Sequence, residues 1–172
     1  MPIRPILRYG SPVLHVPSAP VTNIDGQVVS LVSDMVATMY GAPGIGLAAP
    51  QIGVPLRVIV IDLSVGEDKK QLIKLVNPEL VEEEGEQRHD EGCLSVPGYY
   101  ASPVRPNRVT VKGLDLDGKE QVYTATELLA RAFCHEIDHV DGLLFVDRLS
   151  PLKRDLLKRK LRKRVKNDDW EE

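Results

Sequence analysis

The string HEIDH at residues 135–139 constrains this chain more than any other feature, because it implies a helix and places two histidines on it. Around Thr124 the spacing of apolar residues changes from the two-residue period of a strand to the 3.6-residue period of a helix. Thr124 and Glu127 have the capping-box spacing, which predicts a helix that starts near Ala125. Gly142 predicts its end, just beyond the last turn.

Both histidines lie on one face of this predicted helix. At about 100° per residue, four side chains fall within roughly 60° of one another, namely Leu128, Ala132, His135 and His139. Glu136 lies on the flank of that face, where its carboxylate can reach a water molecule at a divalent metal held by the two imidazoles. Two core histidines beside an incidental glutamate are the alternative, which the complete string on a capped helix disfavours.

A catalytic metal site of this type needs a third protein ligand and an open position. Cys134 is adjacent to His135 in sequence but lies about 100° around the helix, so we expect it to be a packed small apolar residue. Cys93, in the stretch EGCLSVPG, is a better candidate, because a thiolate there can reach the helix and binds zinc or ferrous iron well. A buried free thiol remains the alternative for Cys93, and His15 and His89 are expected to be surface or packing residues.

The remaining patterns predict an α+β fold with mostly antiparallel sheets packed around the central metal-binding helix, plus an N-terminal and a C-terminal helix. The 172 residues favour one domain, with a catalytic part over 1–149 and a basic helix and tail over 150–172 in the same domain. The predicted elements are a helix over 27–40, a strand over 56–63, two strands around Asn77-Pro78, a hairpin over 108–126, and a helix from Ser150-Pro151.

Amino-acid composition limits the cellular compartment and the classes of partner that we expect for this protein. Two cysteines are too few for a secreted disulfide scaffold, and a formal net charge of −3 argues against a general nucleic-acid or membrane binder. The N-terminus lacks the apolar run of a signal peptide, and no stretch approaches about 18 continuous apolar residues. We therefore expect a cytoplasmic protein with no membrane partner.

A third unusual stretch, GIGLAAPQ, covers residues 44–51. Two glycines around one aliphatic residue allow another backbone to come close, although a GxG alone is usually a turn. No third glycine and no βαβ unit follow, so nucleotide binding is excluded. Gln51 is a candidate oxyanion donor.

Together the stretches GIGLAAPQ, EGCLS and HEIDH, in this order and at these separations, resemble the three signature motifs of bacterial peptide deformylase. The flanking stretches ILRYGSPVLHVPSAPV, VNPEL and GLLFVDRLSPLKR extend the resemblance over essentially the whole chain, in the form that ends in a long C-terminal helix. The family usually has glutamine where this chain has Cys134, and Arg131 and His89 leave the preference beyond the first substrate residue open.

The resemblance implies a role for each matching residue. The metal ligands would be Cys93, His135 and His139, the acid/base Glu136, the oxyanion donors Gln51 and the Leu94 N–H, and the backbone contacts to an extended substrate Ile45, Gly46 and Gly92. An apolar pocket that includes Ile45, Leu128 and Ala132 would take the methionine side chain.

The implied reaction removes the formyl group from the N-terminal formylmethionine of new polypeptides and releases formate. The resemblance also implies Fe²⁺ in the cell, with Zn²⁺, Ni²⁺ or Co²⁺ as replacements in purified protein. Three other hypotheses stay open at this point: a zinc endopeptidase of the HExxH type, a metal-free thiol hydrolase that uses Cys93, and a binding module with a closed structural site.

The C-terminal segment is strongly basic. Residues 150–172 hold nine Lys or Arg and five Asp or Glu, a net charge of +4 against −7 for the rest of the chain. An apolar stripe of Leu152, Leu156 or Leu157, Leu161 and Val165 suggests that one face packs and the other is solvated. The basic face suits RNA phosphate, and the resemblance implies docking on the large ribosomal subunit near the tunnel exit. We expect the protein to be a monomer.

Overall fold

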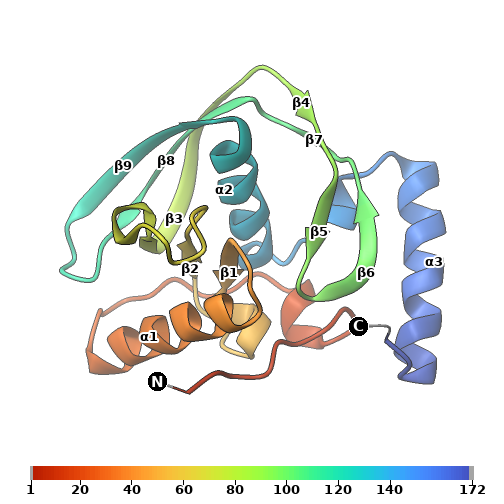
Figure 1. The fold of residues 1–172 in the computed structure, drawn as a ribbon, viewed down its shortest axis with the longest axis horizontal. Coiled ribbons are helices and arrows are strands. Elements are labelled where there is room, and N and C mark those ends of the chain that lie inside the picture. Colours follow the sequence, from red (N-terminus) through yellow and green to blue (C-terminus); the bar gives the residue numbers. More distant parts are fainter. Residues whose placement is uncertain (1, 171–172) are drawn as a thin grey trace.

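A computed structural model describes residues 2–170 and shows a central five-stranded antiparallel sheet (Figure 1). The spatial order is β1-β2-β3-β8-β9, and every neighbouring pair is antiparallel. The strands span Gly46–Ala48 (β1), Val58–Ile61 (β2), Ile73–Glu84 (β3), Arg108–Leu114 (β8) and Glu120–Thr126 (β9).

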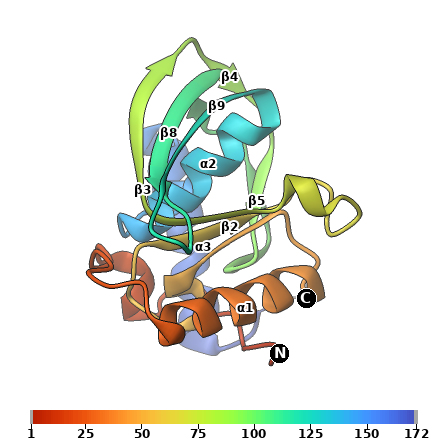
Figure 2. The same ribbon diagram turned by 90° about the vertical axis from the view of Figure 1, so that its left-hand side faces the viewer.

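Two helices cover opposite faces of this sheet, because strand side chains alternate between the faces. Ile59 and Ile61 of β2 belong to the apolar cluster that packs against α2 (Glu127–Val140). Val58 and Val60 belong to the cluster beneath α1 (Gly26–Gly41). Figure 2 shows the two helices separated by the strands. The fully buried β2 therefore forms the middle layer.

The helix α2 lies between the main sheet and a second, smaller β-structure (Figure 1). This part contains β5 (Glu91–Cys93) paired with β6 (Val96–Ala101), and β4 (Gln87–Arg88) paired with β7 (Val104–Arg105). Beyond it lies α3 (Pro151–Asn167), and Leu161 of α3 shares an apolar cluster with Val96 and Phe145. Residues 2–170 also contain four 3-10 helices, which are Pro12–His15 (η1), Ala49–Ile52 (η2), Lys69–Gln71 (η3) and Phe145–Arg148 (η4).

The α+β prediction is confirmed, with the HEIDH helix at its centre. The first helix is capped by Asp25, whose carboxylate accepts from the N–H groups of Gln27 and Val28. The hairpin predicted over 108–126 forms as β8 and β9. Among residues 2–170, no helix is both long and apolar enough to cross a membrane.

The two strands predicted around Asn77-Pro78 are a single strand, so that prediction was wrong. β3 continues through this point with a shift of register against β8 between Val76 and Glu79. Asn77 has a φ of 52°, and its side-chain amide bonds both backbone groups of Val21. The irregularity that resembled a break in sequence is therefore a β-bulge tied to the N-terminal segment.

The start of α2 also differs in detail from the expectation, and the start of α3 lacks an expected side-chain cap. α2 begins at Glu127 because the ladder between β8 and β9 continues to Thr126, so no capping box forms with Thr124. Its end is as predicted, since Gly142 follows with a φ of 82°, and a Cβ there would lie 2.6 Å from the Val16 carbonyl carbon. α3 starts after Ser150 as predicted, although the Ser150 side chain makes no capping hydrogen bond.

Candidate active site

Three segments that are distant in sequence converge on a cavity of about 540 Å³. The helix α2 contributes His135 and Glu136, β5 contributes Cys93, and η2 contributes Gln51. His139 lies deeper, fully buried one turn further along α2. η2 and β5 approach the same face of α2, since Nε2 of Gln51 lies 3.7 Å from Sγ of Cys93.

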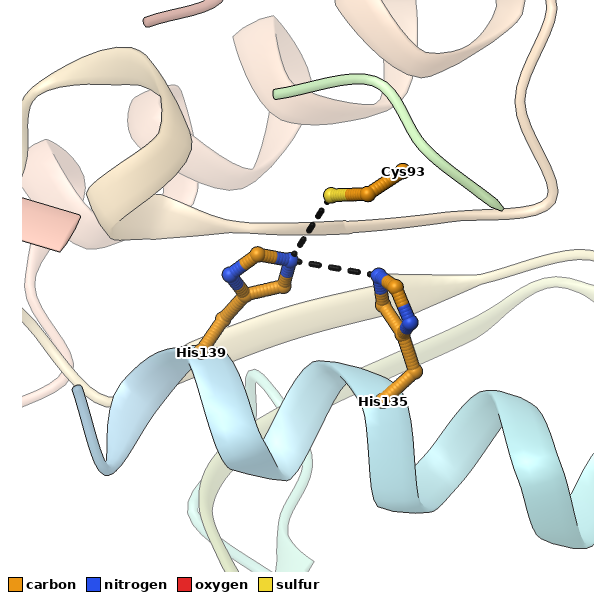
Figure 3. Close-up of side chains that lie close together, drawn as sticks. All are labelled: Cys93, His135 and His139. Carbon is orange, nitrogen blue, oxygen red and sulfur yellow. Dashed lines mark hydrogen bonds between the residues drawn. The ribbon is translucent and has the colours of Figure 1, made fainter. Parts of the chain in front are cut away.

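The side chains of Cys93, His135 and His139 point toward one another (Figure 3). Nε2 of His139 lies 3.3 Å from Sγ of Cys93 and 3.2 Å from Nε2 of His135, and the three donor atoms lie within 4.8 Å of one another. A tetrahedral metal with bonds of about 2.0–2.1 Å to nitrogen and about 2.3 Å to sulfur needs donors roughly 3.3–3.6 Å apart. The three residues therefore fit a divalent metal, with a fourth position left for water or substrate.

The carboxylate of Glu91 determines which nitrogen of His135 faces the metal position. Oε1 of Glu91 lies 2.6 Å from Nδ1 of His135. Burial raises the pKa of Glu91, but hydrogen bonds from His135 and Arg105 outweigh it and bring the pKa to about 2. An ionised carboxylate can only accept, so Nδ1 carries the hydrogen and Nε2 keeps its lone pair for a metal.

The pKa values of His135 and His139 are shifted in opposite directions. Burial lowers the pKa of His139 well below its ordinary value, so this imidazole stays neutral as a metal ligand must. Burial also opposes charge on His135, but the nearby Glu136 and Cys93 outweigh it and raise the pKa well above its ordinary value. Proton release from His135 is therefore coupled to the arrival of a metal cation.

Glu136 is 4% exposed, and its Oε1 has no hydrogen-bond partner among residues 2–170. Burial raises its pKa to about 7, so the carboxyl group can both take and return a proton near neutral pH. Gly46 makes room for it, since a Cβ at that position would lie 2.5 Å from Glu136 Oε2. The second glycine of GIG is thus required by the carboxylate, a reason that sequence reasoning missed.

Gln51 is buried and held in one orientation. Its Oε1 accepts from the Ala48 N–H at 2.9 Å, and its Nε2 donates to Ser95 Oγ at 3.1 Å. The same Nε2 lies 3.7 Å from Sγ of Cys93, so the amide borders the metal position. The candidate oxyanion donor is 2% exposed, a burial that the sequence did not indicate.

The predicted substrate-contacting residues all line the same cavity, and they come from α2, from β5, and from β1 with the residue before it. They are Ile45, Gly46, Gly92, Leu128 and Ala132, and the predicted oxyanion donor Leu94 lines the cavity too. Leu128 is 41% exposed, so it belongs to the cavity rim and not to the ordinary core. Gly92 has a packing role as well, because a Cβ there would lie 2.7 Å from the ring of Tyr100.

A buried ion-pair network behind the candidate metal ligands was not foreseen from the sequence. Arg105, 3% exposed, bonds Glu91 at 2.6 Å and Asp138 at 2.6 Å, and Arg148 bonds Asp138 at 2.8 Å. The only signal was the presence of Glu91 and Asp138 inside the motifs EGCLS and HEIDH. The network joins β5, β7, α2 and η4 beneath His135.

The remaining cysteine and histidines, Cys134, His15 and His89, lie away from the candidate metal position, as the sequence suggested. Cys134 is buried on a different face of α2, beside a separate cavity of about 490 Å³, and burial raises its pKa to about 11. His15 and His89 are exposed. Both cysteines are free thiols in the structure.

Two histidines, a cysteine, a buried glutamate and a buried amide around one cavity define a class of hydrolase with a three-ligand metal site. The chain matches the polypeptide deformylase family over residues 3–155 and belongs to that family. Members of this family hydrolyse the N-formyl amide of nascent polypeptides, so the chain is a metal-dependent hydrolase of translation and N-terminal processing. This favours deformylation over internal peptide cleavage.

Similar proteins cover the chain almost completely. A peptide deformylase of Acidobacterium capsulatum is 50% identical over 99% of this chain and 100% of its own length. A crystal structure of the Legionella pneumophila peptide deformylase has 49% identity and a TM-score of 0.88, covering 99% of this chain and 100% of that one. The Synechococcus elongatus enzyme in complex with actinonin has 39% identity and a TM-score of 0.86, covering 93% of this chain and 89% of that one.

Proposed function

We propose that Cys93, His135 and His139 hold the metal and that Glu136 is the catalytic acid/base in the removal of the formyl group. The observation that best supports this proposal is that the three donor atoms converge beside the buried Glu136 carboxylate, whose Oε1 has no hydrogen-bond partner among residues 2–170. When bound, a divalent metal supplies Lewis-acid chemistry that makes water a nucleophile at neutral pH and polarises a carbonyl.

Side chains and backbone groups of the protein would transfer the proton and stabilise the developing negative charge. Glu136 takes a proton from the attacking water and passes it to the leaving amine nitrogen, which fits its raised pKa of about 7. The Nε2 group of Gln51 and the N–H of Leu94 donate to the formyl oxygen as negative charge develops, a contribution of about 3 kcal/mol for one such donor. Water adds to the formyl carbon, the C–N bond breaks, and formate and a free amine leave.

The substrate chain would lie extended between two backbone segments. We infer contacts to the backbone of Ile45, Gly46 and Gly92, in the manner of an added strand. The first side chain would enter the apolar side of the cavity, beside Leu128 and Ala132. A formyl hydrogen is the smallest acyl substituent, so a narrow site accepts it and rejects larger acyl groups.

We propose ferrous iron as the metal in the cell, with zinc, nickel or cobalt able to replace it. The donor set supports this choice, since two imidazoles and a thiolate suit iron and zinc alike. A thiolate ligand on ferrous iron also predicts sensitivity to oxygen, because the Cys93 sulfur can be oxidised stepwise.

The basic α3 is proposed to dock on ribosomal RNA of the large subunit near the tunnel exit. Leu161 is fully buried against Phe145, which supports α3 as part of one domain with residues 1–149. Its basic side chains remain exposed, among them Lys153, Arg159, Lys160, Arg162, Lys163 and Lys166. We propose that the protein works in the cytoplasm as a monomer, since one chain supplies all the ligands.

Formate release from formyl-Met-Ala-Ser tests this function, with wild type compared to Glu136→Gln at equal metal content. The variant keeps the shape of the side chain but cannot carry the proton, so we expect kcat to fall about 10²–10⁴-fold. A variant that retains metal and the full rate would refute the assigned role of Glu136. Cleavage of an internal bond in an unformylated peptide would instead support an endopeptidase.

A further inference from the structure

Arg131 is a charged residue in the lining of the cavity to which the proposed mechanism gives no role. It lies on α2 one turn before His135 and is half-buried. Its neighbours in the lining from the same helix are Leu128 and Ala132. A cation therefore stands beside the apolar surface that the first substrate side chain would use.

A neutral amide holds the guanidinium of Arg131 in place. Its Nη1 donates to Oε1 of Gln87 at 2.9 Å. Nε2 of Gln87 donates to the carbonyls of Pro106 and Glu127, each at 2.9 Å, which fixes the oxygen toward Arg131. The carbonyl of Glu127 belongs to the first turn of α2, so the guanidinium is directed toward that end of the helix, away from His135.

The charge of Arg131 is not neutralised within the structure. Arg105 and Arg148 pair with Glu91 or Asp138, whereas no carboxylate of residues 2–170 forms an ion pair with Arg131. A guanidinium has five N–H donors, and the contact with Gln87 uses one of them. The remaining donors are available to an acceptor on a bound chain.

The alternation of side chains along an extended substrate determines which substrate residue lies near Arg131. Side chains alternate along an extended chain, so the first and third side chains share one side and the second points away. With the first side chain beside Leu128 and Ala132, the third lies on the α2 side, about 6.6 Å further along. The end of α2 near Glu127 lies roughly 12 Å along the helix axis from His135, within reach of a long third side chain.

We propose that Arg131 is a specificity-determining residue that favours an acidic side chain at the third position of the formylated polypeptide. This inference rests on the proposed function, because it assumes a substrate that lies extended in the cavity. It assigns a preference by charge to a position beyond the formylated residue. The second position is its internal control, because that side chain faces away from α2.

The test uses formylated tripeptide amides, whose blocked C-terminus adds no carboxylate. We expect kcat/KM for formyl-Met-Ala-Glu to exceed that for formyl-Met-Ala-Gln about two- to fivefold, as for a partly exposed ion pair. The advantage should shrink in high salt. Formyl-Met-Glu-Ala and formyl-Met-Gln-Ala should differ little. Equal rates for Glu and Gln at the third position would overturn the inference.

Substitutions at position 131 test whether the charge of Arg131 causes the preference. In Arg131→Gln the ratio of kcat/KM for Glu over Gln at the third position should fall to about one, and Arg131→Glu should reverse the preference toward Lys. Arg108→Gln removes an exposed charge on β8 outside the cavity and should keep the wild-type ratio. A wild-type ratio in Arg131→Gln would contradict the proposal. Absence of formate from every peptide with metal-loaded wild type would refute the proposed function instead.

Discussion

The carboxylate of Glu91 lies 2.6 Å from Nδ1 of His135, two residues before the cysteine that faces the same metal position. One short strand therefore carries both the thiolate and the group that orients an imidazole. Arg105 binds both oxygens of that carboxylate, donating from Nε to Oε2 and from Nη2 to Oε1, the oxygen that also faces His135. Metal affinity and the stability of the fold are thus linked through a single buried ion-pair network.

Replacing Glu91 with Gln should weaken metal retention about 10–100-fold, because a neutral amide oxygen accepts the His135 Nδ1–H more weakly than a carboxylate and no longer makes the imidazole a more basic ligand. The measurement is competition for the metal against a chelator of known affinity. Glu67→Gln, in an exposed loop, is the matched control and should leave affinity unchanged. Unaltered retention in Glu91→Gln would show that the negative charge of Glu91 does not contribute to metal binding through His135.

Replacing Arg105 with Gln should lower the free energy of unfolding by about 3–5 kcal/mol, because the buried carboxylates of Glu91 and Asp138 lose their shared partner. Urea unfolding in the presence of a chelator measures this without a contribution from metal binding. Arg154→Gln breaks only a surface pair with Asp155, 3.6 Å long, and should cost less than about 1 kcal/mol. Equal losses in the two variants would contradict the assigned importance of the network.

Replacing Ser95 with Ala should lower kcat about tenfold and change KM little, because Gln51 loses the acceptor that aims its amide. Steady-state kinetics on formyl-Met-Ala-Ser separate the two constants. Ser18 is a buried serine whose hydroxyl has no partner among residues 2–170, so Ser18→Ala is the control. A change in KM alone would indicate that Ser95 affects substrate binding and not the transition state.

The pair of Tyr40 and Asp62 predicts a pH window of stability. Burial raises the pKa of Asp62, but bonds from Ser64, Tyr40 and Gly66 outweigh it and bring the pKa below its ordinary value of 3.8. Burial and the bond to Asp62 raise the pKa of Tyr40 from 10.0 to about 12. The contribution of Asp62 is present above its ordinary pKa and is lost as pH falls, whereas that of Tyr40 is lost as pH rises from 10 to 12.

Tyr40→Phe tests this window through the difference in unfolding free energy from wild type at a series of pH values. The difference should be largest between about pH 4 and pH 10 and should shrink at both ends. Tyr100→Phe, at a tyrosine that is 73% exposed, should show no such profile. A constant difference for Tyr40→Phe across the whole range would contradict the assigned bond.

Replacing the exposed basic side chains of α3 with glutamine should weaken ribosome binding and flatten its dependence on salt. The suitable set is Lys153, Arg159, Lys160, Lys163 and Lys166. Truncation before α3 is a poorer test, because it removes Leu161 from its apolar cluster. Lys69 and Lys70, exposed on η3, provide the matched charge control. Co-sedimentation with ribosomes measures the effect, and binding equal to wild type would refute docking through α3.

Local patterns in the sequence were sufficient for the helices and for the shared face of the two histidines. Helix geometry alone places His135 and His139 on one side and Cys134 on another, because residues four apart are neighbours on a helix. Gly142 likewise ended α2 where a left-handed residue was needed. The bulge at Asn77 and the true start of α2 were not predictable, because contacts with Val21 and β8 determine them.

The sequence by itself determined which chemical groups this protein has and which of them share a helix face. The tertiary structure determines how Cys93 reaches the histidines, since Cys93 and His139 lie 46 residues apart and Nε2 of His139 is 3.3 Å from the Cys93 Sγ. It also decided that Gln51 is buried, that Gly46 makes room for Glu136, and that Arg105 links two motifs. The physical reason is that these contacts depend on long-range packing of separate strands against α2, which no local periodicity records.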